Sequence, residues 1–316
     1  MHPSYADVTA AADRISGQIR PVVMARADAD TVPVDGQVWL ALEHMQHTGS
    51  FKARGAANFT LAHREQGQLP KVGVTIASGG NAGVACAWAT RLVDSAATVF
   101  LPDSAPVVKV NRLKALGAQV LSGGASYADA AADCQRYADV TGALRSHAYD
   151  DPYIAAGAGT LLDEIADQLP NLDTVVVSVG GGGLLTGITV AANHHGVRVV
   201  AVEPENCRAF NAALEAGHPV DVEIDSVAAD SLGARRATAM ALSAAAEGEV
   251  RSVLVSDADI IAARQSLWDT RRLAVEHAAA TALAALHSGA YVPAHDERTA
   301  VIVCGANTDP SDLVGN

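Results

Sequence analysis

The chain is poor in lysine and in positive charge as a whole. Its 316 residues include 22 lysines and arginines against 35 aspartates and glutamates, which gives a formal net charge of -13. A nucleic-acid backbone requires a basic protein surface, and an anionic membrane attracts the same kind of surface. The composition therefore indicates neither a nucleic-acid partner nor a membrane partner.

Cysteine is also scarce, and long hydrophobic runs are missing from the sequence. The four cysteines lie far apart and form no Cys-x-x-Cys pair, so they indicate neither a zinc site nor a disulfide framework. No apolar block near the first residue is suited to a signal peptide, and no run approaches the length of a membrane span. We therefore expect a cytoplasmic protein with reduced thiols.

What the chain does contain is an alternation of short apolar runs with helical segments. Residues 72–77 and 173–179 are apolar runs of strand length, and each precedes a segment of helical periodicity. This alternation is typical of an α/β protein. With 49% hydrophobic residues, the chain can bury one large core or two modest ones. Residues 204–249 show no clear pattern.

One of the four lysines lies in an unusual place. Lys52 belongs to the segment HTGSFKARGA (47–56), between an aromatic and a small residue. Ser50 is the expected N-cap of a helix that carries Lys52. The other three lysines are expected to be solvated surface charges, namely Lys71, Lys109 and Lys114. Lys52 is thus a candidate for a buried, functional amine.

Four consecutive glycines, at residues 180–183, stand between an apolar run and a helical segment. They would leave backbone N–H groups uncovered at the positive end of a helix, which suits a phosphate, and a flexible turn is the alternative. Their spacing is not that of the dinucleotide motif G-x-G-x-x-G, and no lysine follows as in a P-loop. Dinucleotides and triphosphates are therefore not the expected ligands.

A second polar turn, SGGNAG at residues 78–83, also joins an apolar run to a helical segment. Its backbone N–H groups could bind a carboxylate, and Asn81 offers both a donor and an acceptor. Alone, such a turn is equally well explained as structural. Together, however, an isolated lysine, a phosphate cup and a carboxylate-binding turn are what a pyridoxal phosphate enzyme needs.

The same segments resemble a known family. TGSFKARGA, SGGNAG, AGAGTLLDEI, GGGGLLTG and VCGANTD occur in the order and spacing of the serine/threonine dehydratases, pyridoxal phosphate enzymes of the tryptophan-synthase-β-like fold. The resemblance extends from the first helix to about Asp309. It implies an α/β fold of two domains with twisted open sheets flanked by helices. Residues 1–72 and 148–316 would form a large cofactor-binding domain, and residues 73–147 a small, mobile substrate domain.

The resemblance also implies roles for individual residues. Lys52 would form the Schiff base with pyridoxal 5'-phosphate and would exchange the α-proton of the substrate, because burial lowers the pKa of an amine by up to about 3–5 units. Phe51 would pack on the cofactor ring, and Cys304 would face the ring nitrogen as a neutral partner. The phosphate cup would be Gly180, Gly181, Gly182, Gly183 and Leu184. The cofactor hydroxyl would bind Asn81, and the substrate carboxylate would bind Ser78, Gly79, Asn81 and Ala82.

The implied activity is the β-elimination of water from serine, threonine or a related 3-hydroxy amino acid, with release of a 2-oxo acid and ammonia. A homodimer is the expected assembly. Serine racemases of the same group carry a second serine where this chain has Gly79. A racemase, a β-replacement synthase and a non-catalytic protein that binds the cofactor remain alternatives.

Some relatives bind a divalent cation through the counterpart of Glu203. Here Ala209 stands where a third ligand is needed, and oxygen-ligated cations recruit several oxygens. We therefore predict no metal, and a solvated surface charge is the expected state of Glu203.

Overall fold

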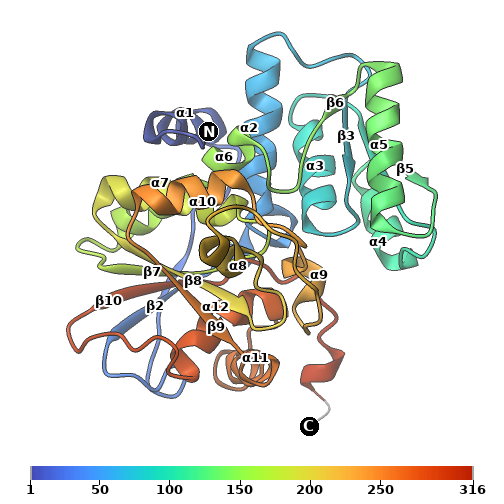
Figure 1. The fold of residues 1–316 in the computed structure, drawn as a ribbon. Helices are drawn as coiled ribbons and strands as arrows, with labels where there is room; N and C mark the ends of the chain where they lie inside the picture. The colour runs from blue at the N-terminus through green and yellow to red at the C-terminus, as the bar shows by residue number, and fades with distance from the viewer. Residues whose placement is uncertain (1, 315–316) are drawn as a thin grey trace.

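The computed structural model describes residues 2–314, whose strands form two separate sheets flanked by helices (Figure 1). The larger sheet has the strand order β1-β2-β10-β7-β8-β9, and the smaller one has the order β5-β4-β3-β6. Every pair is parallel except the edge pair β1–β2. The predicted α/β fold with two open sheets flanked by helices is confirmed.

The centre of the larger sheet is apolar on both faces. Its strands are β1 (Met24–Arg26), β2 (Gln37–Ala41), β7 (Thr174–Ser178), β8 (Arg198–Pro204), β9 (Val250–Val255) and β10 (Arg298–Ile302). Every residue of β7 is buried, as expected where helices cover both faces of a parallel sheet. Val176 pairs with Val200 on one side and with Val301 on the other, so the core runs through the sheet.

Helices pack on both faces of this sheet (Figure 1). One face carries α7 (Gly183–His195), with α6 (Pro152–Gln168), α10 (Ala239–Glu247) and α1 (Tyr5–Ile15) beside it. The other face carries α12 (His277–His287), which is covered by α11 (Asp257–Arg271). The unclear stretch 204–249 holds two more short helices, α8 (Ala209–Ala216) and α9 (Ala229–Leu232), joined by irregular backbone.

The smaller sheet is built from one continuous part of the chain. Its strands are β3 (Val74–Ala77), β4 (Ala97–Leu101), β5 (Gln119–Ser122) and β6 (Leu144–Arg145), and its helices are α3 (Asn81–Arg91), α4 (Val107–Ala115) and α5 (Tyr127–Thr141). This part lies within the predicted small domain, 73–147. The division into two domains and the mobility of the smaller one stay predictions, and residues 1 and 315–316 of that division lie outside the described residues.

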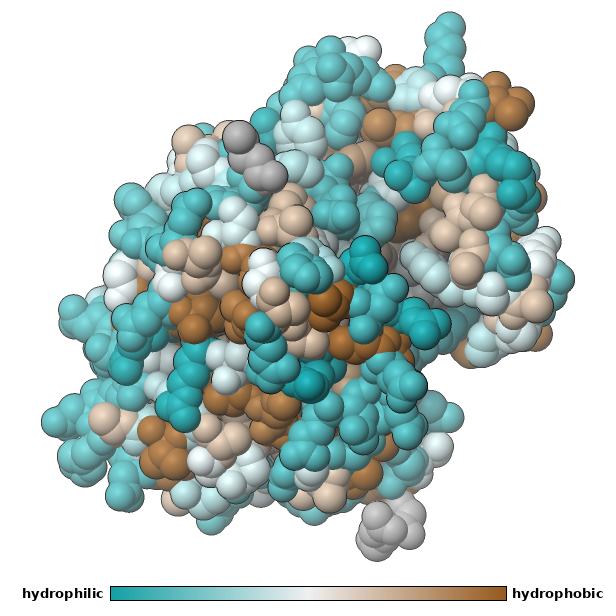
Figure 2. All heavy atoms as spheres, viewed as in Figure 1, coloured by the Kyte–Doolittle hydropathy of each residue, from teal (hydrophilic) through white to brown (hydrophobic). Residues whose placement is uncertain are grey.

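Helix α2 (Lys52–Glu65) runs between the two parts, where it contacts α6 and α3 (Figure 1). The surface is recessed along this junction in the same view (Figure 2). The described residues also contain three short 3-10 helices: η1 (Glu43–Met45), η2 (His47–Gly49) and η3 (Ser311–Leu313). Within residues 2–314, no helix has the length and apolar character needed to cross a membrane.

The start of α2 is fixed by backbone contacts with the end of β10. The amide of Phe51 donates to the carbonyl of Cys304 at 3.0 Å, and Ser50 forms an antiparallel bridge with Gly305. Phe51, not Ser50, is the N-cap, and it makes no side-chain capping bond. The prediction that Ser50 caps this helix is therefore wrong, because the extended backbone of Ser50 is used for pairing with Gly305.

A buried arginine anchors the first turn of α2. The guanidinium of Arg54, which is 0% exposed, binds both oxygens of Glu43 at 2.6 and 3.0 Å. It also binds the carboxylate of Glu164 in α6 at 2.7 and 2.9 Å. Paired charges of this kind are tolerated in a core only while every partner is present. Two residues before Arg54 on the same helix stands Lys52, so this cluster also fixes the place of the lysine.

We expect Arg54→Ala to lower the free energy of unfolding by about 3–5 kcal/mol, because it leaves the Glu43 carboxylate buried without its cation. Urea unfolding of the apo protein measures the change. Arg64→Ala on the exposed side of the same helix is the matched control, with an expected loss within about 0.5 kcal/mol. Equal losses in the two variants would contradict this assignment.

Candidate active site

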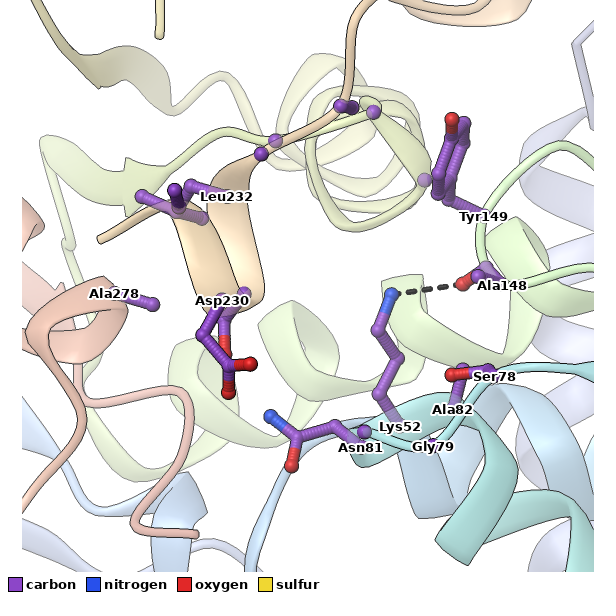
Figure 3. Close-up of a pocket in the computed structure, with 18 of the residues that line it drawn as sticks. Lys52, Ser78, Gly79, Asn81, Ala82, Ala148, Tyr149, Asp230, Leu232 and Ala278 are labelled. Carbon is purple, nitrogen blue, oxygen red and sulfur yellow. Dashed lines mark hydrogen bonds between the residues drawn. The ribbon is translucent and has the colours of Figure 1, made fainter. Parts of the chain in front are cut away.

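The side chain of Lys52 ends inside a cavity of about 640 Å³ between the two sheets. Its Nζ donates to the carbonyl of Ala148 at 2.7 Å and lies 4.7 Å from the ring centroid of Phe51. Figure 3 shows the amine between the turn of Ser78, on one side, and Asp230 and Leu232 of α9 on the other. The amine is therefore directed into a partly open cavity that has room for a ligand.

The cavity changes the proton affinity of this amine. Desolvation lowers the pKa of Lys52 from 10.5 to about 8, against the opposing effects of Cys304 and Glu276. A shift of this size leaves a substantial neutral fraction near physiological pH, whereas an exposed lysine is almost wholly charged. A neutral amine can act as a nucleophile toward an aldehyde and can accept a proton.

The four glycines form the end of the cavity at the N-terminus of α7. Gly182 is the N-cap with φ of +101°, and no side chain within the described residues caps this end. A Cβ on Gly183 would lie 2.7 Å from the carbonyl oxygen of Tyr149, and a Cβ on Gly181 would overlap the tyrosine ring. Since side chains are excluded, the first amides of the helix face the cavity and can bind an anion.

The second polar turn lies beneath Lys52 and joins β3 to α3 (Figure 3). Gly80 is the N-cap of α3, again without a side-chain capping bond in the part of the chain that the structure describes. A Cβ on Gly83 would collide with the carbonyl of Ser78, which explains the need for glycine in so tight a turn. Two helix N-termini therefore face the cavity, that of α7 beside the larger sheet and that of α3 beside the smaller sheet. Each can bind a negatively charged group.

A hydrogen-bonded cluster of four residues borders the same cavity. Nδ2 of Asn81 lies 3.0 Å from each oxygen of Glu276, and the hydroxyl of Ser231 donates to Glu276 at 2.7 Å. The backbone amide of Asn307 donates to Glu276 at 2.7 Å, and its side-chain Nδ2 donates to Oδ1 of Asn81 at 2.5 Å. No role was assigned to Glu276 from the sequence. The feature that could have drawn attention to it is its position, as an acidic residue directly before an almost uniformly apolar helix.

Cys304 lies at the end of β10 and is 5% exposed. Burial, followed by the negative charge of Glu276, raises the pKa of its thiol well above the ordinary value, so the group is neutral at physiological pH. A neutral thiol is a weak hydrogen-bonding partner. This state agrees with the expected neutral partner for a ring nitrogen.

Every residue that the resemblance assigned to the site lines this one cavity, although the roles themselves stay predictions. These residues are Phe51, Lys52, Ser78, Gly79, Asn81, Ala82, Gly180, Gly181, Gly182, Gly183, Leu184 and Cys304. Lys109 lines it too and forms an ion pair of 2.6 Å with Asp230. Lys109 keeps 33% of its side chain exposed, so its charge is solvated as expected although it also lines the cavity, and Lys71 and Lys114 are exposed.

Glu203 is buried at the end of β8, not solvated as expected. Its two oxygens accept from the backbone amides of Phe210 and Asn211, both at 2.7 Å, so it caps α8. Burial raises the pKa of Glu203 to about 8, against these two bonds. Among residues 2–314 no three His, Cys, Asp or Glu side chains are grouped as metal ligands.

The fold and the cavity define a class of protein: an α/β protein in which a lysine of lowered pKa faces two anion-binding turns. A ligand with an aldehyde and a phosphate fits this arrangement, since the glycine cup has no side chains and the amine is within the same cavity. Such a ligand joined to an amino acid would also use the second turn for the carboxylate.

Comparison with known proteins identifies the family. Residues 15–305 match the family described as pyridoxal-phosphate dependent enzyme. The chain is 36% identical to a serine dehydratase-like protein of Mus musculus, over 85% of both chains. It is 31% identical to an L-threonine ammonia-lyase of Thermotoga maritima, over 96% of this chain and 75% of the relative. The chain belongs to the pyridoxal-phosphate dependent enzymes, and its cofactor is pyridoxal 5'-phosphate.

Solved structures agree with this assignment. A serine racemase from maize superimposes with a TM-score of 0.91 at 26% identity, over 99% of this chain and 96% of that one. The tryptophan-synthase-β-like fold expected from the sequence, which is fold type II of these enzymes, is therefore confirmed.

We expect Lys52→Met to make the apo protein more stable at pH 7, by up to about 3 kcal/mol, because it removes a buried charge. The folded protein holds the Lys52 proton more weakly than the unfolded chain does. The gain is therefore complete below about pH 8 and disappears as the pH rises toward 10.5.

Chemical denaturation of both apo proteins at pH 7 and pH 10 measures this effect. Lys71→Met serves as the control, because that lysine is exposed and its removal should have little effect at either pH. A stability difference for Lys52→Met that is constant with pH would contradict the buried-charge explanation.

Proposed function

We propose that this protein catalyses the β-elimination of water from serine, threonine or a related 3-hydroxy amino acid, with release of a 2-oxo acid and ammonia. The relatives named serine dehydratase-like and L-threonine ammonia-lyase support this activity. The single observation that carries it is the cavity in which the Lys52 amine lies between two uncapped helix N-termini. An amino-acid carboxylate and a cofactor phosphate need one such terminus each.

In this proposal the glycine loop and Leu184 bind the phosphate, and Phe51 packs against the cofactor ring. Asn81 and Cys304 bind the ring oxygen and the ring nitrogen. Ser78, Gly79, Asn81 and Ala82 hold the substrate carboxylate at the N-terminus of α3, where the helix dipole favours a negative charge. When bound, the cofactor supplies an aldehyde for amines and a ring that withdraws electrons from the α-carbon of the substrate.

Lys52 performs the proton transfer in this scheme. Desolvation lowers the pKa of its amine to about 8, so a fraction is neutral near physiological pH and Nζ can take a proton from the substrate and return it. General acid–base catalysis of this kind contributes about 10²–10⁴ in rate.

The neutral thiol of Cys304 favours elimination over reactions that need a long-lived carbanion. A carboxylate at the same place would keep the ring nitrogen protonated and the ring strongly electron-withdrawing. A neutral thiol does this weakly, so the prompt departure of the β-hydroxyl is the favoured outcome.

The smaller sheet, residues 73–147, is proposed to act as a mobile substrate domain. Two contacts join its helix α4 to the larger part: the Lys109–Asp230 ion pair, and a bond from Arg112 to the carbonyl of Thr48 at 3.0 Å. Both ends of the ion pair line the cavity, so its opening would widen the entrance. A homodimer, a cytoplasmic location and the absence of a bound metal remain part of the proposal.

We expect the purified protein to bind pyridoxal 5'-phosphate with a visible absorption band and to release a 2-oxo acid from serine or threonine. Lys52→Met should lose both the band and the activity, because the amine that reacts with the aldehyde is gone. Absorption spectra and a 2-oxo acid assay over a panel of hydroxy amino acids measure this. A coloured wild-type protein without 2-oxo acid release would favour a non-catalytic binding protein.

A racemase is the second candidate, favoured by the similarity to the maize serine racemase. We expect Gly79→Ser to raise the formation of D-serine, since it supplies the hydroxyl that racemases carry at this position. The new Cβ would lie 2.9 Å from Cδ2 of Leu101, the end of a flexible side chain, so a small shift accommodates it.

Chiral chromatography of the product measures the change. The wild-type protein, assayed in parallel, is the reference. Unchanged D-serine formation in Gly79→Ser would contradict the role assigned to this face of the cofactor.

A further inference from the structure

A buried carboxylate in the cavity is bound by neutral donors alone. Glu276 precedes α12, is 4% exposed, and lines the cavity together with Lys52 and Cys304. Its donors among the described residues are the amide of Asn81, the hydroxyl of Ser231 and the backbone of Asn307. Carboxylates are almost never buried without a specific reason, because their desolvation is costly.

The negative charge of Glu276 determines which atoms of the cluster donate hydrogen bonds and which accept them. An ionised carboxylate can only accept hydrogen bonds, so Asn81 must turn its nitrogen, not its oxygen, toward Glu276. Oδ1 of Asn81 is then occupied by Nδ2 of Asn307, whose backbone amide is itself held by Glu276. Oδ1 of Asn81 therefore accepts and its Nδ2 donates, each with a partner in this cluster.

We propose that Glu276 is a positioning residue that fixes Asn81 as a hydrogen-bond donor toward the ring oxygen of the cofactor. The proposal rests on the cofactor site described above, in which Asn81 binds that oxygen. Oδ1 is occupied by Asn307 and one hydrogen of Nδ2 is directed to the carboxylate of Glu276, so the second hydrogen of Nδ2 is the one that remains for the ligand. A donor at this place favours the charged, deprotonated form of the ring oxygen, the form that gives the bound cofactor its visible band.

Glu276 also influences the two groups nearest to the reaction. Desolvation lowers the pKa of Lys52, and the negative charge of Glu276 opposes this effect. The same carboxylate adds to burial in keeping the thiol of Cys304 neutral. A neutral amide at position 276 would carry no charge, and it could donate hydrogen bonds as well as accept them.

Glu276→Gln is the direct test, since glutamine has the same size but can both donate and accept. Asn81 would then be free to turn its oxygen toward the cofactor. We expect the visible band to weaken relative to the near-ultraviolet band, and the dissociation constant of the cofactor to rise about tenfold or more. Absorption spectra of the purified variant give the ratio of the two bands, and a titration with the cofactor gives the dissociation constant.

Glu203→Gln is the matched control. Glu203 is also a buried carboxylate that accepts two backbone bonds, but it does not line the cavity. We expect this variant to lose thermal stability and to keep the wild-type spectrum and cofactor affinity. Glu276→Asp keeps the charge, so it should retain a visible band even if its affinity falls, and it decides the question should Glu276→Gln fail to fold.

Two results would overturn the proposal: a wild-type spectrum and affinity in Glu276→Gln, or a loss of the visible band in Glu276→Asp as complete as that in Glu276→Gln. Either would show that Glu276 acts through packing alone. A wild-type protein that stays colourless with the cofactor would instead overturn the proposed function itself, so the two failures are distinguishable.

Discussion

The site depends on the joint between the end of β10 and the start of α2. The bond from Phe51 to the carbonyl of Cys304 and the bridge between Ser50 and Gly305 connect segments about 250 positions apart in the sequence. β10 is a central strand of the larger sheet, so the joint has a rigid support. It brings Lys52 and Cys304 to the same cavity, which the two glycine-rich turns also line.

The joint holds a group that the protein would otherwise expel. Burying the amine of Lys52 costs free energy, as its lowered pKa shows. Two residues further along α2, Arg54 is tied to two carboxylates from different parts of the chain, which prevents the first turn of the helix from moving toward solvent. The chain thus combines a destabilising group with an anchoring cluster on one helix, as expected where function needs strain that the fold must offset.

Much of the fold could be predicted because the central strands are continuous apolar runs. Residues 72–77 and 173–179 contain β3 and β7 within one or two positions of the ends found in the structure. β1 has only three residues and therefore no periodicity to recognise, and residues 204–249 were unclear because α8 and α9 are short. Local signals also fail where long-range contacts decide, as in the case of Ser50, whose backbone pairs with a strand far away in sequence.

Some residues of the site could likewise be predicted from sequence patterns, and others could not. The lysine and the two glycine-rich turns have recognisable sequence patterns, because a backbone conformation that excludes side chains requires glycine. Glu276, Ser231 and Asn307 have no such pattern, since their grouping depends on how α12, α9 and the end of β10 meet in space. The ion pair of Lys109 could not be predicted for a similar reason: its partner Asp230 belongs to the part of the chain that gave no clear pattern.

The tyrosine beside the glycine loop has a consequence for how this site can diverge. The ring of Tyr149 occupies the volume that a side chain on Gly181 would need, and its carbonyl blocks Gly183 in the same way. A residue with a side chain at position 181 therefore requires a smaller residue at position 149. In evolution, Tyr149 has to change before Gly181 does.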